Sequence, residues 1–186
     1  MFIIKDNYYL YIENTKTLDL DIIKKNKKIS IIYRNNDVQE NYININKFRN
    51  ECKRKKFKFF VANDFKLAKY CRADGLYLSS YNKKLYLKKN LNVIGSAHSF
   101  REINEKIKQG CNEVILSRLF KTSYKNKRHY LGITKFNLIK KNFTIELSPL
   151  GGINSFNLLK LNLVTSKGLC LLSEIKKKPA ITSRLF

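Results

Sequence analysis

A pair of glycines in the stretch Pro149–Ser155 has the residue types of an anion-binding turn. Gly151 and Gly152 follow an apolar run, and a residue without a Cβ atom lets the backbone approach a ligand closely. We expect a helix over Ser155–Leu161 that Asn154 caps, so that the first amides of the helix point at a negatively charged group. The turn therefore predicts a phosphate site. The same two glycines are also typical of a tight strand-to-helix connection without a ligand.

Polar side chains also follow most of the other apolar runs, at the points where strands would end. They are Arg34, Asn63, Asp64, the segment 79–82, Ser96, His98 and the segment 117–125. The set is mostly basic or hydroxyl-bearing, and it has one carboxylate and no evident pair for general acid–base catalysis. These residue types fit the binding of phosphorylated molecules better than hydrolysis.

Eight short apolar runs, most of them followed by a helical pattern, predict the elements that position these residues. The runs are Tyr8–Glu13, Ile29–Tyr33, Phe57–Ala62, Gly75–Leu78, Asn92–Ala97, Glu113–Ser117, Ile145–Leu150 and Gly168–Leu172. Eight alternations of strand and helix favour an α/β fold, a closed single-domain (β/α)8 TIM barrel. The barrel is pared down, with short first and last helices. It occupies residues 1–175, and residues 176–186 form a basic C-terminal tail or a partial last helix.

The fifth helix is the one with the clearest boundaries. Ser99 and Glu102 have the spacing of a capping box, and Gly110 stands just past the expected end. Phe100, Ile103 and Ile107 are spaced to line one face of this helix. We expect that face to pack on the barrel.

Composition limits the classes to which the chain could belong. A length of 186 residues with 44% hydrophobic residues favours one globular domain, and no apolar run reaches the length of a membrane span. The segment Met1–Leu10 lacks the features of a signal peptide. The four cysteines are widely spaced and lie in apolar patterns, which favours buried thiols in the cytoplasm over disulfides or zinc.

The formal charge of +24 has two interpretations. A basic surface could bind a polyanion, and basic clusters occur in residues 24–28, 53–58 and 121–128. The alternative is a compositional drift toward Lys, Asn and Ile, because the lysines are scattered over almost every segment. No nucleic-acid-binding motif is present, so specific nucleic-acid binding is not indicated.

The residues at the strand ends resemble the thiamine phosphate synthase and thiazole tautomerase (TenI) superfamily. The matching stretches occur in family order and cover most of the chain from residue 57 onward, and they are closest to a short synthase-like branch associated with α-proteobacteria. They are Val61–Asp64 with Ala73–Leu78, Ile94–Ser99, Ser117–Lys125 with Leu131–Gly132, Leu150–Asn154 and Leu171–Ile175. The resemblance implies a transferase of thiamine biosynthesis that condenses a hydroxymethylpyrimidine diphosphate with a thiazole phosphate, releasing pyrophosphate.

The resemblance also implies a role for each matching residue. Arg34 and Lys125 would bind the diphosphate, Ser96 would donate a hydroxyl to it, and Asn63 would contact the pyrimidine. Asp64 would ligate Mg²⁺. The thiazole phosphate would be held by Thr122, Gly151, Gly152, Leu172 and Ser173, largely through backbone N–H groups.

Several family positions carry other residues here. Ile32 stands in place of a Gln, Asn36 in place of a Lys, and Tyr124 in place of a Thr. The second metal-binding Asp is replaced by Asn82, and the loss of one of two carboxylates weakens a magnesium site. Arg118 occupies the position of the tautomerase His, so the tautomerase activity is disfavoured.

Alternative readings stay open for single residues and for the whole chain. Asp64 precedes an amphipathic pattern and could cap a helix, and His98, beside the capping box, could be structural. The chain could be an active synthase. It could instead be a paralogue that binds thiazole or thiamine phosphates without making the bond, as a carrier or regulator, or a basic polyanion-binding barrel. Assembly into a homo-oligomer is left open.

Overall fold

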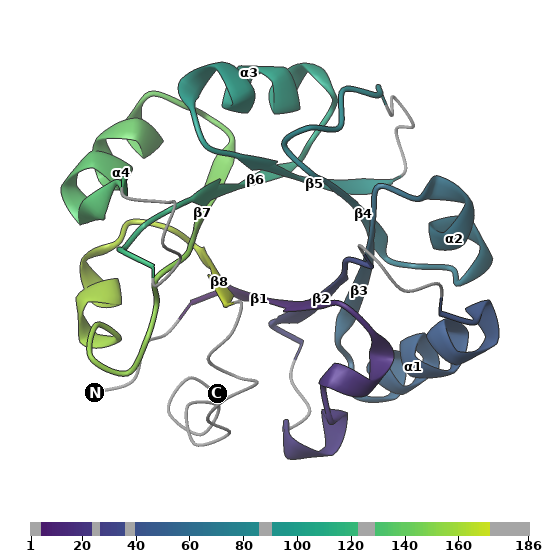
Figure 1. Cartoon of the computed structure of the whole chain (residues 1–186). Helices are drawn as coiled ribbons and strands as arrows, with labels where there is room; N and C mark the ends of the chain where they lie inside the picture. Colours follow the sequence, from purple (N-terminus) through teal and green to yellow (C-terminus); the bar gives the residue numbers. More distant parts are fainter. Residues whose placement is uncertain (1–4, 24–26, 36–39, 86–90, 123–128, 172–186) are drawn as a thin grey trace.

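The computed structural model of the chain describes residues 5–23, 27–35, 40–85, 91–122 and 129–171. Eight parallel strands pair in chain order, and β8 pairs with β1, so the sheet closes into a barrel (Figure 1). The strands are β1 (Asn7–Ile12), β2 (Ile29–Tyr33), β3 (Lys58–Ala62), β4 (Gly75–Leu78), β5 (Asn92–Ala97), β6 (Glu113–Ser117), β7 (Glu146–Leu150) and β8 (Gly168–Leu171). The expected barrel and all eight expected strands are confirmed.

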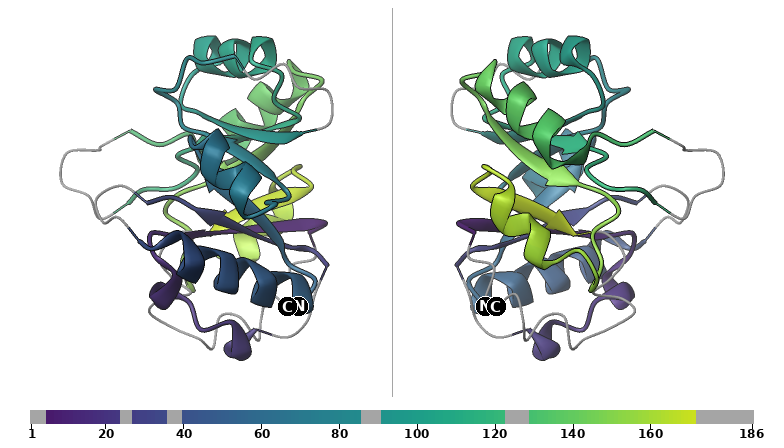
Figure 2. Two further views of the ribbon diagram at one scale, coloured as in Figure 1. Left: turned by 90° about the vertical axis from the view of Figure 1, so that its right-hand side faces the viewer. Right: turned by 90° about the vertical axis from the view of Figure 1, so that its left-hand side faces the viewer.

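Four α-helices cover the outside of the barrel in the described part of the chain. They are α1 (Tyr42–Arg54), α2 (Phe65–Tyr70), α3 (Phe100–Lys108) and α4 (Gly132–Lys141). Helices α3 and α4 lie on the wall opposite α1 (Figure 2). Two short 3-10 turns, η1 (Thr15–Thr17) and η2 (Leu20–Ile22), follow β1 in place of a helix, so the first crossover is pared down as expected. The described residues after β4, 79–85, also form no helix.

The prediction of a helix over Ser155–Leu161 is wrong. The chain forms turns there and then a 3-10 helix, η3 (Leu159–Leu163). Asn154 Oδ1 accepts from the Phe156 N–H, but the carbonyls of Asn154 and Asn157 accept from the N–H groups three residues on, those of Asn157 and Lys160. Bonds over three residues form turns and 3-10 helices, not an α-helix. Asn154 therefore caps a turn, and the phosphate site expected here cannot rest on a helix N-terminus.

The hydrophobic core has two layers because successive side chains of a strand point to opposite faces of the sheet. The larger cluster lies between the strands and the outer elements. The smaller cluster fills the inside of the barrel. It consists of Tyr9, Tyr11, Ile32, Phe60, Tyr77, Ile94, Ile115 and Cys170. The interior is therefore packed, and ligands are expected at its C-terminal mouth.

Helix α3 begins as expected but packs on a different face. Ser99 Oγ accepts from the Glu102 N–H, as in a capping box, whereas the Glu102 carboxylate accepts from the His98 N–H. The apolar face predicted for this helix is partly wrong, because Phe100 and Ile107 are 47% and 40% exposed. Ile103 is buried, and so is Lys106, whose ammonium group finds acceptors beneath the loop that follows β4.

Candidate functional site

Arg34 lies at the mouth of the barrel, where β2 ends. Its N–H donates to the Ile12 carbonyl at 2.8 Å and so extends the pairing of β1 and β2 by one residue. The positive charge of Arg34 acts on the hydroxyls of Tyr11 and Tyr77 inside the barrel. Its Nε atom is buried and has no hydrogen-bond partner in the part of the chain that the structure describes. The structure thus places a cation with an unused donor where the diphosphate site was expected.

Ser96 belongs to the same group of residues as Arg34, Tyr11 and Tyr77. It is buried on β5, and its hydroxyl lies near that of Tyr77. Burial raises the pKa of Tyr77, while the hydroxyls of Ser96 and Tyr11 partly lower it. Arg34 and Ser96, predicted as site residues, are brought together by two tyrosines that the sequence analysis missed. The alternation of Tyr9 and Tyr11 along the first strand was the signal that could have placed tyrosines inside the barrel.

Asn63 follows β3 with a left-handed backbone, φ 57°. Its Oδ1 accepts from the Ser79 N–H at 3.0 Å and from Asn82 Nδ2 at 3.0 Å. Its Nδ2 donates to Ser79 Oγ at 2.7 Å and to the Tyr81 hydroxyl at 3.1 Å. An amide side chain has two donors and two acceptor lone pairs, so its capacity is filled. Asn63 ties the β3 end to the loop after β4, and its contact with a pyrimidine stays a prediction.

The residues expected to bind Mg²⁺ are engaged in other contacts. Asp64 Oδ1 accepts from the Leu67 N–H at 2.9 Å and caps α2. The side chain of Asn82 donates to Asn63 and accepts from the Lys84 N–H. In the described ranges no group of three or more His, Cys, Asp or Glu residues could hold a metal ion. One carboxylate that already serves as a cap does not build a magnesium site, and no step below is assigned to the metal.

The glycine turn after β7 packs against the segment that follows β6. Gly151 and Gly152 have φ values of 100° and 71°, which glycine adopts without strain. A Cβ atom on Gly152 would lie 2.5 Å from the carbonyl oxygens of Phe120 and Lys121. The Phe120 N–H donates to the Gly151 carbonyl at 3.0 Å, which closes the contact. A residue with a Cβ atom does not fit at Gly152. The segments after β6 and β7 therefore pack together at the mouth of the barrel.

The remaining predicted residues fall into three groups. Thr122 Oγ1 accepts from Arg118 at 3.3 Å and lies on the segment that meets the glycine turn. His98 is exposed and lies 3.1 Å from the carboxylate of Glu102. Three expected phosphate ligands, Lys125, Leu172 and Ser173, lie outside the described residues.

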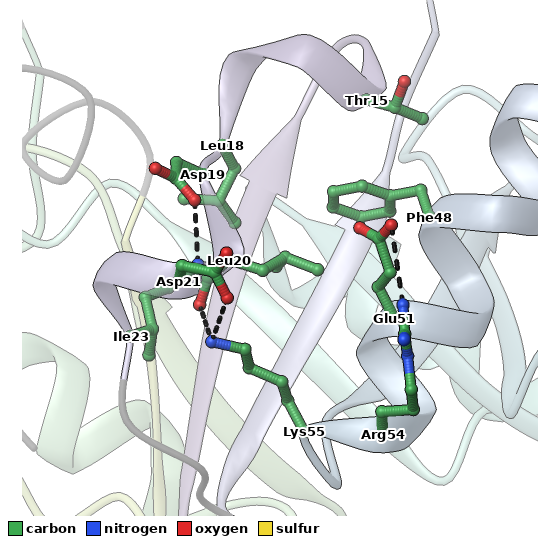
Figure 3. Close-up of a pocket in the computed structure, with 10 residues that line it drawn as sticks. All are labelled: Thr15, Leu18, Asp19, Leu20, Asp21, Ile23, Phe48, Glu51, Arg54 and Lys55. Atoms are coloured by element: carbon green, nitrogen blue, oxygen red, sulfur yellow. Dashed lines mark hydrogen bonds and ion pairs between the residues drawn. The ribbon is translucent and has the colours of Figure 1, made fainter.

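A groove of about 700 Å³ lies on the outer wall between α1 and the segment that follows β1 (Figure 3). Its apolar lining includes Leu20, Ile23 and Phe48. Most of its charged residues pair with one another, as Lys55 does with Asp21 at 2.8 Å. None of the predicted site residues lines it. The groove lies on the outer wall, where a helix after β1 would pack, and not at the mouth of the barrel.

The four cysteines are buried and free, as expected. Burial raises the pKa of the Cys111 thiol to about 12, and it raises those of the other three thiols as well. Thiols with raised pKa values are poor nucleophiles at neutral pH. Nucleophilic cysteine chemistry therefore has no support at this site.

The described helices include none that is both long and apolar enough to cross a bilayer.

The family model described as thiamine monophosphate synthase (TMP-TENI) matches residues 10–175. Two thiamine-phosphate synthases from strains of Prochlorococcus marinus are similar to this chain. One is 31% identical over 124 residues, which is 64% of this chain and 34% of the relative. The other is 27% identical over 183 residues, which is 93% of this chain and 52% of that relative.

This chain spans between about a third and a half of the length of these two relatives. Among solved structures, the thiamine phosphate pyrophosphorylase from Pyrococcus furiosus aligns with a TM-score of 0.73. Its sequence is 19% identical, and the alignment covers 96% of this chain and 91% of that one. At this identity the likeness concerns the fold. An α-proteobacterial branch stays a prediction.

Proposed function

The chain belongs to the thiamine monophosphate synthase family, and we propose that it joins a pyrimidine diphosphate to a thiazole phosphate to give thiamine phosphate and pyrophosphate. The bond between the pyrimidine methylene carbon and the diphosphate oxygen breaks with its electron pair on the oxygen. The thiazole nitrogen then forms a bond to that carbon with its lone pair. The protein must balance the charge of the leaving group and align the two substrates.

The observation that carries the proposal is the glycine turn after β7. The N–H groups of Gly152 and Ile153 have no acceptor among the described residues. They belong to a turn that packs tightly against the carbonyls of residues 120 and 121 at the C-terminal end of the barrel. Free amides in a glycine turn at this end of a barrel suit a phosphate group. We assign the thiazole phosphate to this turn, beside Thr122.

We assign the diphosphate to the group of residues around Arg34. The buried Nε donor of Arg34 has no partner among the residues described, and Ser96 supplies a hydroxyl in the same group. A guanidinium binds phosphate oxygens through charge-assisted hydrogen bonds. Lys125 would add a second cation, as the resemblance implies. A cytoplasmic location and assembly into homo-oligomers stay predictions.

A second function is favoured by a separate observation. The Asn82 side chain donates a hydrogen bond to Asn63, so two family ligand positions serve the protein's own loops. A barrel that binds thiazole or thiamine phosphates without making the bond fits this arrangement. The net charge of +24 supports a third function, a polyanion-binding surface.

Incubation of the purified chain with both phosphorylated substrates, with and without Mg²⁺, separates the three. We expect thiamine phosphate and pyrophosphate, measured by chromatography, and a loss of product in Arg34→Met. Arg54→Met, on the exposed face of α1, is the matched control and should keep activity. Saturable binding of thiazole phosphate without product would favour the second function. RNA binding that Gly152→Ala leaves unchanged, without product, would favour the third.

A further inference from the structure

Two tyrosines of β1 point into the barrel, two residues apart, and they differ in one respect. The hydroxyl of Tyr9 donates to the Glu113 carboxylate, which also accepts from Ser148. The hydroxyl of Tyr11 has no hydrogen-bond partner among the described residues, although the residue is only 8% exposed. Tyr77 and Cys170 lie close enough to affect the pKa of Tyr11, but neither completes a hydrogen bond of normal geometry with it.

An unpaired buried hydroxyl lowers the stability of a protein, so its retention requires a reason. Burial raises the pKa of Tyr11 well above its usual value, and the hydroxyl therefore remains a neutral donor at neutral pH. A second unpaired donor, Nε of Arg34, belongs to the same group of residues. Two unused donors at the mouth of one barrel indicate that a ligand supplies their acceptors.

The surroundings of Tyr11 select the kind of acceptor. The rings of Tyr11 and Tyr77 meet edge to face, with centroids 5.3 Å apart and planes at 85°. Ile32 and Phe60 belong to the same buried cluster. A phosphate group requires several polar or charged donors, and the Arg34 guanidinium and the glycine turn provide these. Next to Tyr11 the walls are aromatic and aliphatic, which suits a flat ring with one polar atom at its edge.

We propose that the Tyr11 hydroxyl determines specificity by donating a hydrogen bond to an acceptor atom on the heteroaromatic ring of the bound substrate. The inference rests on the proposed function, which supplies ligands with such rings. Arg34 binds the phosphate end of the same ligand, and Tyr11 recognises its ring. The competing explanation is a buried water that completes the Tyr11 hydroxyl and has no role in binding.

The test compares Tyr11→Phe with its matched control, Tyr9→Phe. Each change removes one hydroxyl from an inward-facing ring of β1. We measure the dissociation constants of thiamine phosphate and of pyrophosphate by calorimetry, and the thermal midpoint of each variant. Tyr11→Phe should weaken thiamine phosphate binding about tenfold or more, because the acceptor on the ring loses this donor. It should leave pyrophosphate binding unchanged, because pyrophosphate has no ring, and it should keep the midpoint. Tyr9→Phe should lower the midpoint and leave both affinities unchanged.

Two results would overturn the inference, and they are distinguishable. If the wild-type chain binds thiamine phosphate and Tyr11→Phe binds it equally well, the hydroxyl has no role in recognition and the proposed function stands. If the wild-type chain binds neither ligand, the proposed function fails, and the inference fails with it. Tyr11→Leu, which also removes the ring, gives a second measurement if the Phe variant folds poorly, and it should lose affinity for thiamine phosphate more than for pyrophosphate.

Discussion

Nζ of Lys106, on α3, lies 2.7 Å from the carbonyl oxygen of Ser79, at the end of β4. It also donates to the Asn82 carbonyl at 2.9 Å and to Gln109 Oε1 at 2.8 Å, so all three of its donors are used. The stem of Lys106 fills the space beside Gly95, where a Cβ atom would lie 2.8 Å from Lys106 Cγ. Helix α3 therefore holds the helix-free segment that follows β4, and with it the partners of Asn63.

Replacement of Lys106 by Met should destabilise the protein. The change keeps most of the buried stem but leaves the carbonyls of Ser79 and Asn82 without this donor. We expect the free energy of unfolding, measured in urea, to fall by about 3 kcal/mol. Lys108→Met, on the exposed face of the same helix, should change it by less than about 0.5 kcal/mol. Equal stabilities of the two variants would contradict a structural role for the buried ammonium group.

Replacement of Gly152 by Ala tests the packing of the turn after β7. The new methyl group would meet two carbonyl oxygens in addition to the strain of a left-handed backbone. We expect a loss of about 2 kcal/mol or more in the free energy of unfolding, together with a loss of thiazole phosphate binding. Gly132→Ala is the matched control, because its φ is 73° but open space surrounds the added Cβ. It should cost about 1 kcal/mol and leave binding unchanged.

Two changes at Asp64 separate a helix cap from a metal ligand. Asn caps as well as Asp does, so Asp64→Asn should keep the free energy of unfolding measured in EDTA. Asp64→Ala should lower it by about 1 kcal/mol because the Leu67 N–H loses its acceptor. If Mg²⁺ stabilises the wild-type chain but not Asp64→Asn, the carboxylate acts as a ligand as well as a cap.

Glu113 should make stability depend on pH. Burial raises the pKa of Glu113 above its usual 4.5, although the hydrogen bonds from Ser148 and Tyr9 oppose this effect. The folded protein therefore keeps this proton at pH values where the unfolded chain has released it. The stability that the proton confers is full below pH 4.5 and is lost as the pH rises through the raised pKa. The loss amounts to about 1.4 kcal/mol for every tenfold difference between the folded and unfolded acid dissociation constants.

Glu113→Gln should remove this dependence. The difference in free energy of unfolding between wild type and variant, measured in urea at pH values from 4 upward, should decrease as the pH rises. Glu51→Gln, at an exposed position of α1, is the control and should leave the slope unchanged. A difference that grows with pH would mean that the carboxylate is stabilised in its charged form.

The strands were predictable from local sequence because each is a short apolar run bounded by polar residues. Gly75–Leu78 and Glu113–Ser117 have the same bounds in the sequence prediction and in the structure. The helix caps were predictable for the same reason: Ser99 and Asp64 act on amides only a few residues away. The placement of Arg34 and Ser96 at one end of the barrel followed from the parallel order of the strands.

Contacts between distant segments were decided only by the tertiary structure. The spacing of α3 could not reveal that Lys106 is buried, because its acceptors lie 24 and 27 residues away on the loop after β4. Nor could the alternation along β1 reveal that Tyr9 has a partner, Glu113 on β6, whereas Tyr11 has none among the described residues. Apolar periodicity reports which face of a segment leaves water. The pairing of buried polar groups depends on which strands closure of the barrel brings together, and that is a property of the whole chain.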